Sequence, residues 1–148
     1  RKILAVDFDE EKIELAVNGI TKPPNVEFSH QDITKFEFEN YDVFILSDVL
    51  HYLSEDNQFQ VLKRCINKLN QGGIVLIRDG NKDMKKEHKK TRFTEFISTH
   101  FEFNKSEDKK LYFFSTSKLM EITSILGVEV RIIEKGNVTS NTLFLLEK

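Results

Sequence analysis

The stretch YDVFILSDVLHYL, residues 41–53, contains the pattern that decides the fold. Its apolar run VFIL is continuous rather than alternating, which is typical of a strand that is buried on both faces of a parallel sheet. Ser47, Asp48 and His51 follow directly after the run. Because ligands of open α/β sheets bind at the carboxyl ends of the strands, these side chains are candidates for a functional site.

Strands and helices alternate on either side of this stretch. The pattern predicts strands over residues 2–7, 26–28, 41–47, 74–78, 128–133 and 142–146. It predicts helices that begin after Asp9, after Ser54 and after Ser115 or Thr116, and that end at Gly19, at Gly72-Gly73 and at Gly127. The buried stripe of the second helix is expected to be Phe59, Leu62, Ile66 and Leu69. This alternation predicts an α/β layered domain with a mostly parallel sheet, whose last two strands pair antiparallel across a short turn-rich link.

Composition excludes several classes of protein. The 148 residues include 13 Phe and are 39% hydrophobic, enough apolar side chains to fill the core of one domain. No apolar run approaches the roughly 18 residues of a membrane span, and a single cysteine excludes an internal disulfide framework. Residues 1–60 carry five basic and thirteen acidic side chains, which argues against a nucleic-acid duplex as partner. We expect a cytoplasmic location, with Cys65 in the core and no metal site.

Two acids follow the first two strands. Asp7 ends the run ILAVD, and a carboxylate at this place can accept both hydroxyl hydrogens of a ribose. Asp32 comes just after the next strand, where it can accept a hydrogen bond from an exocyclic amine such as that of adenine. Asp9 is the better-placed helix cap, so we expect Asp7 to be free for a ligand.

Four segments together resemble class I S-adenosylmethionine-dependent methyltransferases. They are ILAVDF (3–8), VEFSHQDI (26–33), YDVFILSDVLHYL (41–53) and INKLNQGGIVLIRD (66–79), and the resemblance extends over about residues 2–80. It implies a Rossmann-like sheet, S-adenosylmethionine as cofactor and a small-molecule acceptor.

The resemblance assigns a role to each residue near the cofactor. Asp7 would hold the ribose and Asp32 the adenine amine. Phe8 and Ile33 would pack beside the adenine ring. Ser47 would present its backbone to the methionine part.

The acceptor side of the site is expected after the fourth and fifth strands of that family. Asp48, His51 and Tyr52 would face the methyl group or the acceptor, with His51 as general base on a hydroxyl and Asp79 orienting the acceptor or the base. We expect residues 80–110 to form a lid or acceptor-binding insertion in which His88 and Arg92 contact substrate. The phenylalanines of this region and of residues 113–114 predict an apolar or lipid-like acceptor.

One element of the family pattern is missing. The family binds the methionine end of the cofactor with a glycine-rich turn after its first strand, and no G-x-G-x-G precedes Asp7. The chain also opens inside a strand without Met. We therefore expect residues 1–148 to be one methyltransferase domain truncated at its N-terminus, lacking the first strand and the glycine-rich loop, and binding cofactor poorly alone.

A narrower similarity lies downstream. Residues 77–80, 88–99 and 103–105 are similar to the C-terminal methyltransferase module of large bacterial fusion proteins, which join an MMPL-type exporter to a lysophospholipid acyltransferase. This resemblance implies that the full-length protein is tethered to a membrane and that this chain works at its cytoplasmic face.

Two other functions fit the same pattern. A nicotinamide-dependent dehydrogenase also uses an acid at the end of its second strand. A non-catalytic module that binds cofactor or a partner without turnover would explain the missing glycine-rich turn.

Overall fold

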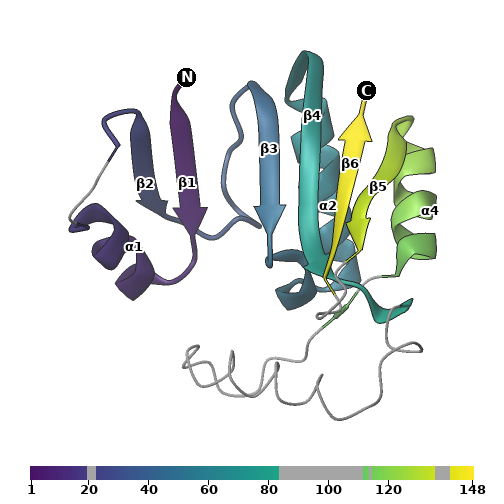
Figure 1. Cartoon of the computed structure of the whole chain (residues 1–148), viewed down its shortest axis with the longest axis horizontal. Coiled ribbons are helices and arrows are strands. Elements are labelled where there is room, and N and C mark those ends of the chain that lie inside the picture. Colours follow the sequence, from purple (N-terminus) through teal and green to yellow (C-terminus); the bar gives the residue numbers. More distant parts are fainter. Residues whose placement is uncertain (20–22, 84–111, 114, 136–140) are drawn as a thin grey trace. The chain divides into compact units, whose positions relative to one another are not determined.

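The computed structural model describes residues 1–19, 23–83, 112–113, 115–135 and 141–148. Its strands form two sheets, and the chain divides into two compact units, residues 1–38 and residues 39–148 (Figure 1). Among the described helices, none is long and apolar enough to cross a membrane.

The first unit is a parallel strand pair with a connecting helix. Strand β1 (Ile3–Asp7) and strand β2 (Val26–His30) pair in register from Ile3 with Val26 to Asp7 with His30. Helix α1 (Glu10–Val17) begins where predicted, because the Asp9 carboxylate accepts a hydrogen bond from the Lys12 amide at 3.3 Å. The carboxyl ends of β1 and β2 therefore lie at one edge.

The second unit contains a four-stranded mixed sheet. Its elements are β3 (Tyr41–Ser47), the 3₁₀-helix η1 (Leu50–Tyr52), α2 (Glu55–Asn67), β4 (Leu69–Gly80), α4 (Thr116–Leu126), β5 (Glu129–Lys135) and β6 (Asn141–Glu147). The strand order is β3-β4-β6-β5; β3 and β4 are parallel, and β6 is antiparallel to both β4 and β5. The predicted α/β fold with a terminal antiparallel pair is confirmed.

The predicted caps of the later helices are also confirmed. The Ser54 hydroxyl accepts from the Asn57 amide at 3.4 Å, and the Ser115 hydroxyl accepts from the Lys118 amide at 3.2 Å. Gly127 ends α4 in the left-handed conformation, with φ 69°.

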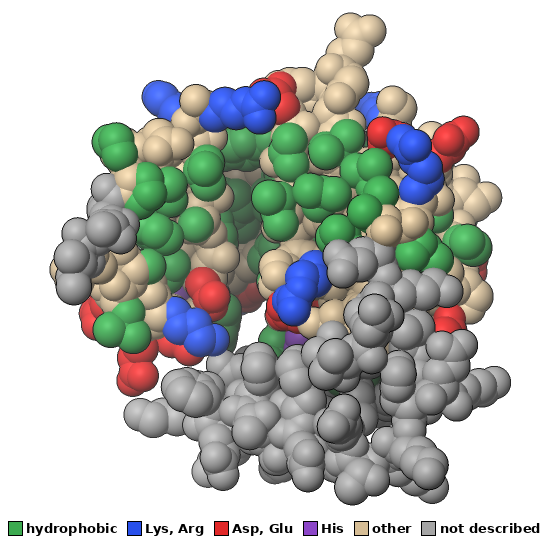
Figure 2. All heavy atoms as spheres, viewed as in Figure 1, with side chains coloured by type: hydrophobic (Ala, Val, Ile, Leu, Met, Phe, Trp, Pro, Cys, Tyr) green, Lys and Arg blue, Asp and Glu red, His purple; other side chains and the backbone are tan. Residues whose placement is uncertain are grey.

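Helices α2 and α4 contact each other and cover one face of the four-stranded sheet. The residues packed beneath them are buried: Phe44, Leu46, Val75, Ile77, Phe144 and Leu146. On the opposite face apolar side chains remain accessible, among them Ile45 with 68% exposure (Figure 2). Cys65 lies in the core as expected, and burial raises the pKa of its thiol to about 12.

Strand β4 begins earlier than the sequence indicates. Helix α2 ends at Asn67 and β4 starts at Leu69, so the prediction that Gly72-Gly73 ends the helix is wrong. The two glycines lie inside β4, opposite an irregularity in the pairing with β3. Gly72 has φ 72°, and a Cβ at Gly73 would lie 2.8 Å from the Asp42 carbonyl oxygen. The glycines therefore serve an irregular strand rather than a helix stop.

Candidate functional site

Asp7 and Asp32 follow neighbouring parallel strands at the same edge. Asp7 is the last residue of β1 and pairs with His30, and Asp32 stands two residues beyond the end of β2. The predicted placement of the two acids at one sheet edge is thus confirmed. Their roles as ligands remain a prediction.

Asp7 has a hydrogen-bond partner that is not expected from the sequence. Its Oδ1 accepts a hydrogen bond from the Asp9 amide at 2.9 Å, so the carboxylate also shapes the turn into α1. Its Oδ2 accepts no hydrogen bond that the structure records among the described residues. Phe8 beside it is 62% exposed, and the Phe8 carbonyl oxygen is 2.9 Å from Nε2 of His30. The aromatic ring is therefore presented to solvent next to the carboxylate.

Asp32 is held by its own loop. Its Oδ1 accepts from the amide and the hydroxyl of Thr34 at 2.9 and 2.7 Å, and its Oδ2 lies 3.6 Å from the Lys35 ammonium. The Thr34 hydroxyl, followed by the Thr34 amide and the Lys35 charge, lowers the pKa of the Asp32 carboxyl below 3.8. Asp32 is therefore ionised at neutral pH. Oδ1 is already bonded to Thr34, so a ligand amine would share Oδ2 with Lys35. Ile33 beside it is half-buried.

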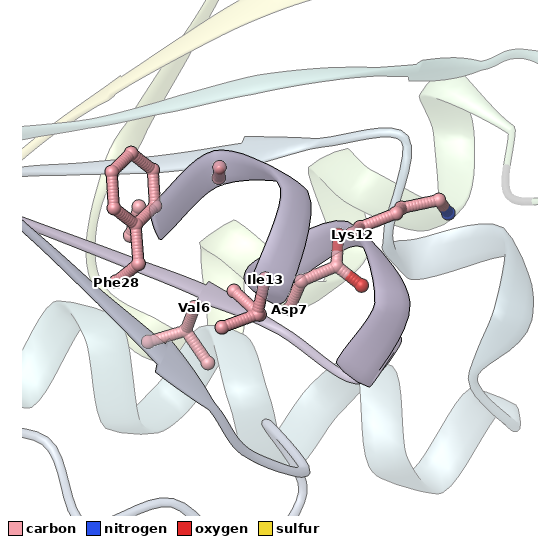
Figure 3. Close-up of a pocket in the computed structure, with 7 residues that line it drawn as sticks. Val6, Asp7, Lys12, Ile13 and Phe28 are labelled. Carbon is pink, nitrogen blue, oxygen red and sulfur yellow. The ribbon is translucent and has the colours of Figure 1, made fainter. Parts of the chain in front are cut away.

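A small cavity lies between α1 and the β1–β2 pair. It has a volume of about 270 Å³, and its lining includes Val6, Asp7, Lys12, Ile13 and Phe28 (Figure 3). Asp7 lines it, but Asp32 and Phe8 do not. This volume lies just below the roughly 300–1,000 Å³ that is usual for small-molecule pockets. Asp7 and Asp32 therefore lie at the same edge of the β1–β2 sheet, but they do not line a common cavity.

His51 and Asp79 form a close pair in the second unit. His51 Nδ1 lies 2.6 Å from Asp79 Oδ1, and the Asp79 side chain is fully buried. Asp79 also accepts from the amides of Leu50 at 2.8 Å and Gly80 at 2.7 Å, with a longer contact of 3.4 Å to the His51 amide. A carboxylate acceptor at Nδ1 selects the tautomer that carries its proton there. Nε2 of the neutral ring then keeps its lone pair.

Asp48 has a different set of partners. It adopts a left-handed backbone conformation, with φ 54°, directly after β3. Its carboxylate is paired with Arg78, accepts from the Ser47 hydroxyl at 3.2 Å, and accepts from the Asn141 side chain at 3.3 Å. The structure therefore separates the candidate acids: Asp79 holds His51, whereas Asp48 ties the ends of β3, β4 and β6 together.

Two aromatic rings contact the His51 imidazole. The ring of Phe113 is stacked on it, with centroids 5.5 Å apart and an interplanar angle of 11°, and the ring of Tyr52 is tilted at 4.0 Å. His88 and Arg92, with most of the expected insertion at 80–110, lie outside the described residues. Gln58, which was not predicted from the sequence, is buried in α2 and hydrogen-bonded to the His51 turn. A polar residue within an otherwise apolar helix stripe was the available signal.

The residues present fit an adenosine-containing cofactor in part. Asp7 can accept from two ribose hydroxyls, because Oδ2 is open and Oδ1 retains a second lone pair. Phe8 offers an exposed ring face, and Asp32 offers one carboxylate oxygen. In the other unit, His51 and Asp79 can take up and stabilise a proton.

Comparison with known proteins agrees with this chemistry. Residues 1–73 match a family described as "Methyltransferase domain". A carboxy-S-adenosyl-L-methionine synthase of Idiomarina loihiensis is 28% identical over 81 residues, which are 53% of this chain and 33% of that protein. The crystal structure of human N-acetylserotonin methyltransferase in complex with S-adenosylmethionine has a TM-score of 0.72 and 17% identity, covering 99% of this chain and 40% of that one. A putative S-adenosylmethionine-dependent methyltransferase from Listeria monocytogenes has a TM-score of 0.71 and 17% identity, covering 99% and 80%.

The likeness to the solved structures confirms the Rossmann-like α/β fold. The family model matches residues 1–73, just under half of the chain, and the solved structures that share the fold include a methyltransferase in complex with S-adenosylmethionine. The chain spans about a third of the length of the curated relatives that it matches.

Proposed function

We propose that this chain supplies part of the active site of an enzyme that transfers a methyl group from S-adenosylmethionine to a small, apolar or lipid-like acceptor. One observation carries the proposal: the segment that matches the methyltransferase family, residues 1–73, contains the two strand-end acids and His51. The family match favours this activity over the nicotinamide-dependent dehydrogenase considered from the sequence.

The cofactor roles are assigned residue by residue from the family resemblance. The Asp7 carboxylate accepts from the ribose hydroxyls, Asp32 Oδ2 accepts from the adenine amine, and Phe8 and Ile33 pack beside the base. Ser47 presents its backbone to the methionine part. S-adenosylmethionine supplies a methyl group that is already activated on a sulfonium sulfur, so these residues act by binding and orientation.

His51 is the general base of the proposed reaction. Its Nε2 takes the proton of the acceptor hydroxyl as the oxygen becomes the nucleophile, and the Asp79 carboxylate stabilises the imidazolium that forms. The 2.6 Å contact at Nδ1 supports this assignment, because it fixes the tautomer that leaves Nε2 basic. Asp48 acts by holding Arg78 and the ends of the strands, and Tyr52 contacts the acceptor.

The remaining substrate contacts are assigned from the sequence resemblance. His88 and Arg92 contact the acceptor from the insertion at 80–110, and residues 1–148 act as one methyltransferase domain. The same resemblance supports a place at the cytoplasmic face of a membrane, within a bacterial fusion protein.

A second candidate function follows from the curated relatives. They are named carboxy-S-adenosyl-L-methionine synthases, so the chain could act on the cofactor itself. Mass spectrometry of the nucleoside product separates the two functions. Methyl transfer gives S-adenosylhomocysteine, whereas synthase activity gives a carboxylated S-adenosylmethionine.

Calorimetry with S-adenosylmethionine tests the cofactor assignment on the protein that carries this chain. Each charge-assisted hydrogen bond to Asp7 is worth about 1.5–3 kcal/mol, and about 1.4 kcal/mol is a factor of ten. Asp7→Ala should therefore weaken binding by at least about tenfold. Glu14→Ala is the matched control, because Glu14 is an exposed carboxylate of α1 outside the proposed site, and it should bind as the wild type does. Equal affinities of the Asp7 variant and the wild type would refute the assignment.

A further inference from the structure

Gln58 occupies a position in α2 where the helix otherwise buries apolar side chains. It is 3% exposed and lies one turn before Val61 and Leu62 in the stripe that continues to Cys65 and Ile66. The expected first member of that stripe, Phe59, is only partly buried. An amide at such a position costs about 1–3 kcal/mol to bury unless its hydrogen bonds are made.

The Gln58 amide nitrogen faces three carbonyl oxygens. Nε2 lies 2.9 Å from the Leu50 oxygen, 3.1 Å from the Leu53 oxygen and 2.7 Å from the Tyr112 oxygen. Since all three neighbours are acceptors, the nitrogen rather than the oxygen of the amide must point toward them. Two of the carbonyls belong to the turn that carries His51, and the third belongs to the segment before α4.

Both backbone groups of Tyr112 are hydrogen-bonded, one to the His51 turn and the other to Gln58 of α2. Its amide donates to the His51 carbonyl oxygen at 2.8 Å, and its own carbonyl accepts from Gln58 at 2.7 Å. The next residue is Phe113, whose ring is stacked on the imidazole. Gln58 therefore fixes the backbone from which Phe113 reaches His51.

We propose that Gln58 is a positioning residue for the base: by holding Tyr112 against the His51 turn, it keeps Phe113 on one face of the imidazole. Asp79 fixes the ring through Nδ1, and Phe113 limits rotation of its plane. Nε2 is then held in the orientation that these two contacts set. This inference rests on the proposed function, in which His51 accepts the proton of the acceptor.

The test uses nuclear magnetic resonance and does not require the acceptor to be known. Gln58→Met keeps the length of the side chain and removes both amide donors. The variant loses the hydrogen bond from Gln58 to the Tyr112 carbonyl, so the backbone at Tyr112 opens more easily. We expect the Tyr112 amide to exchange with solvent at least about tenfold faster, which corresponds to the free energy of about one hydrogen bond. We also expect the His51 ring-proton shift to move toward its value in Phe113→Leu, which lacks the stacked ring. Gln60→Met, at an exposed position of the same helix, should leave both signals unchanged.

Failure of this inference and failure of the proposed function give different results. An unchanged His51 shift and unchanged Tyr112 exchange in a folded Gln58→Met protein would overturn the positioning role, whatever the protein catalyses. If the methionine variant does not fold, Gln58→Asn replaces it, because the shorter amide cannot reach all three carbonyls and the same two signals decide. If methyl transfer is detected, Gln58→Met should lower kcat and leave the affinity for S-adenosylmethionine unchanged. Absence of cofactor binding and of transfer in the wild type would refute the proposed function alone.

Discussion

Replacing Asp79 by alanine removes an acceptor that several donors share. The carboxylate is fully buried, and the amides of Leu50 and Gly80 point at it from 2.8 and 2.7 Å, with His51 Nδ1 at 2.6 Å. Each buried donor left without a partner costs about 1–3 kcal/mol. The turn can relax into the small void, which recovers part of this cost. We therefore expect Asp79→Ala to lower the unfolding free energy by about 3–5 kcal/mol.

Urea unfolding followed by circular dichroism measures this loss. With a slope of about 2 kcal/mol/M, a loss of about 4 kcal/mol moves the midpoint by about 2 M. Asp79→Asn keeps one carbonyl oxygen for the backbone donors, so its loss should be about half as large. Amide exchange at Leu50 and Gly80 should accelerate in both variants. A loss below about 0.5 kcal/mol for the alanine variant, the range of ordinary surface changes, would refute the account of Asp79 as a shared acceptor.

Three more predictions concern other parts of the chain. Gly73→Ala should lower the unfolding free energy by about 1–3 kcal/mol, because its Cβ would lie 2.8 Å from the Asp42 carbonyl, whereas Gly72→Asn should cost less in the same urea assay. Because the pKa of Asp32 is lowered below 3.8, the stability that its carboxylate contributes is fully present above pH 3.8 and is lost as the pH falls through the lowered value. Thr34→Val removes the hydroxyl that lowers this pKa, so thermal unfolding should show the variant destabilised near neutral pH and equal to wild type in stronger acid. Arg78→Leu should release Asp48 from its ion pair and raise the exchange rate of the Asp48 amide, which donates to the Arg78 carbonyl at 2.8 Å.

Local chemistry made much of the fold predictable. Continuous apolar runs mark β1, β3 and the central part of β4, each of which has a parallel neighbour. The expectation that the run in β3 is buried on both faces is wrong, because Val43 and Ile45 are exposed on the face that α2 and α4 do not cover. Side-chain caps at Asp9, Ser54 and Ser115 mark the helix starts, because their oxygens accept from amides three residues on.

The errors arose where long-range pairing decides the structure. Gly72-Gly73 has the composition of a helix stop, but Leu69 already pairs with Tyr41 of β3, and that contact cannot be read from neighbouring residues. The second role of Asp7 is different in origin: it is a local contact with the Asp9 amide, two residues on, that depends on the backbone geometry of the turn before α1.

The residues of the candidate site were predicted from the sequence, but the contacts among them were not. Placing polar residues at the carboxyl ends of strands identified His51, Asp48 and Asp79, since that edge is shared in an open α/β sheet. Which acid holds the imidazole depends on the path of the turn after β3. Gln58 escaped notice because its three carbonyl partners become neighbours only in the folded chain.

The backbone of Asp48 also limits which sequences this position can accept. Its φ of 54° is tolerated by glycine, asparagine and aspartate, whereas a β-branched residue would be strained. In a saturation library selected for folded protein, the survivors at position 48 should therefore be these three residues. A search for distant homologues can use this restriction as a filter, even where overall identity is too low to align the strands.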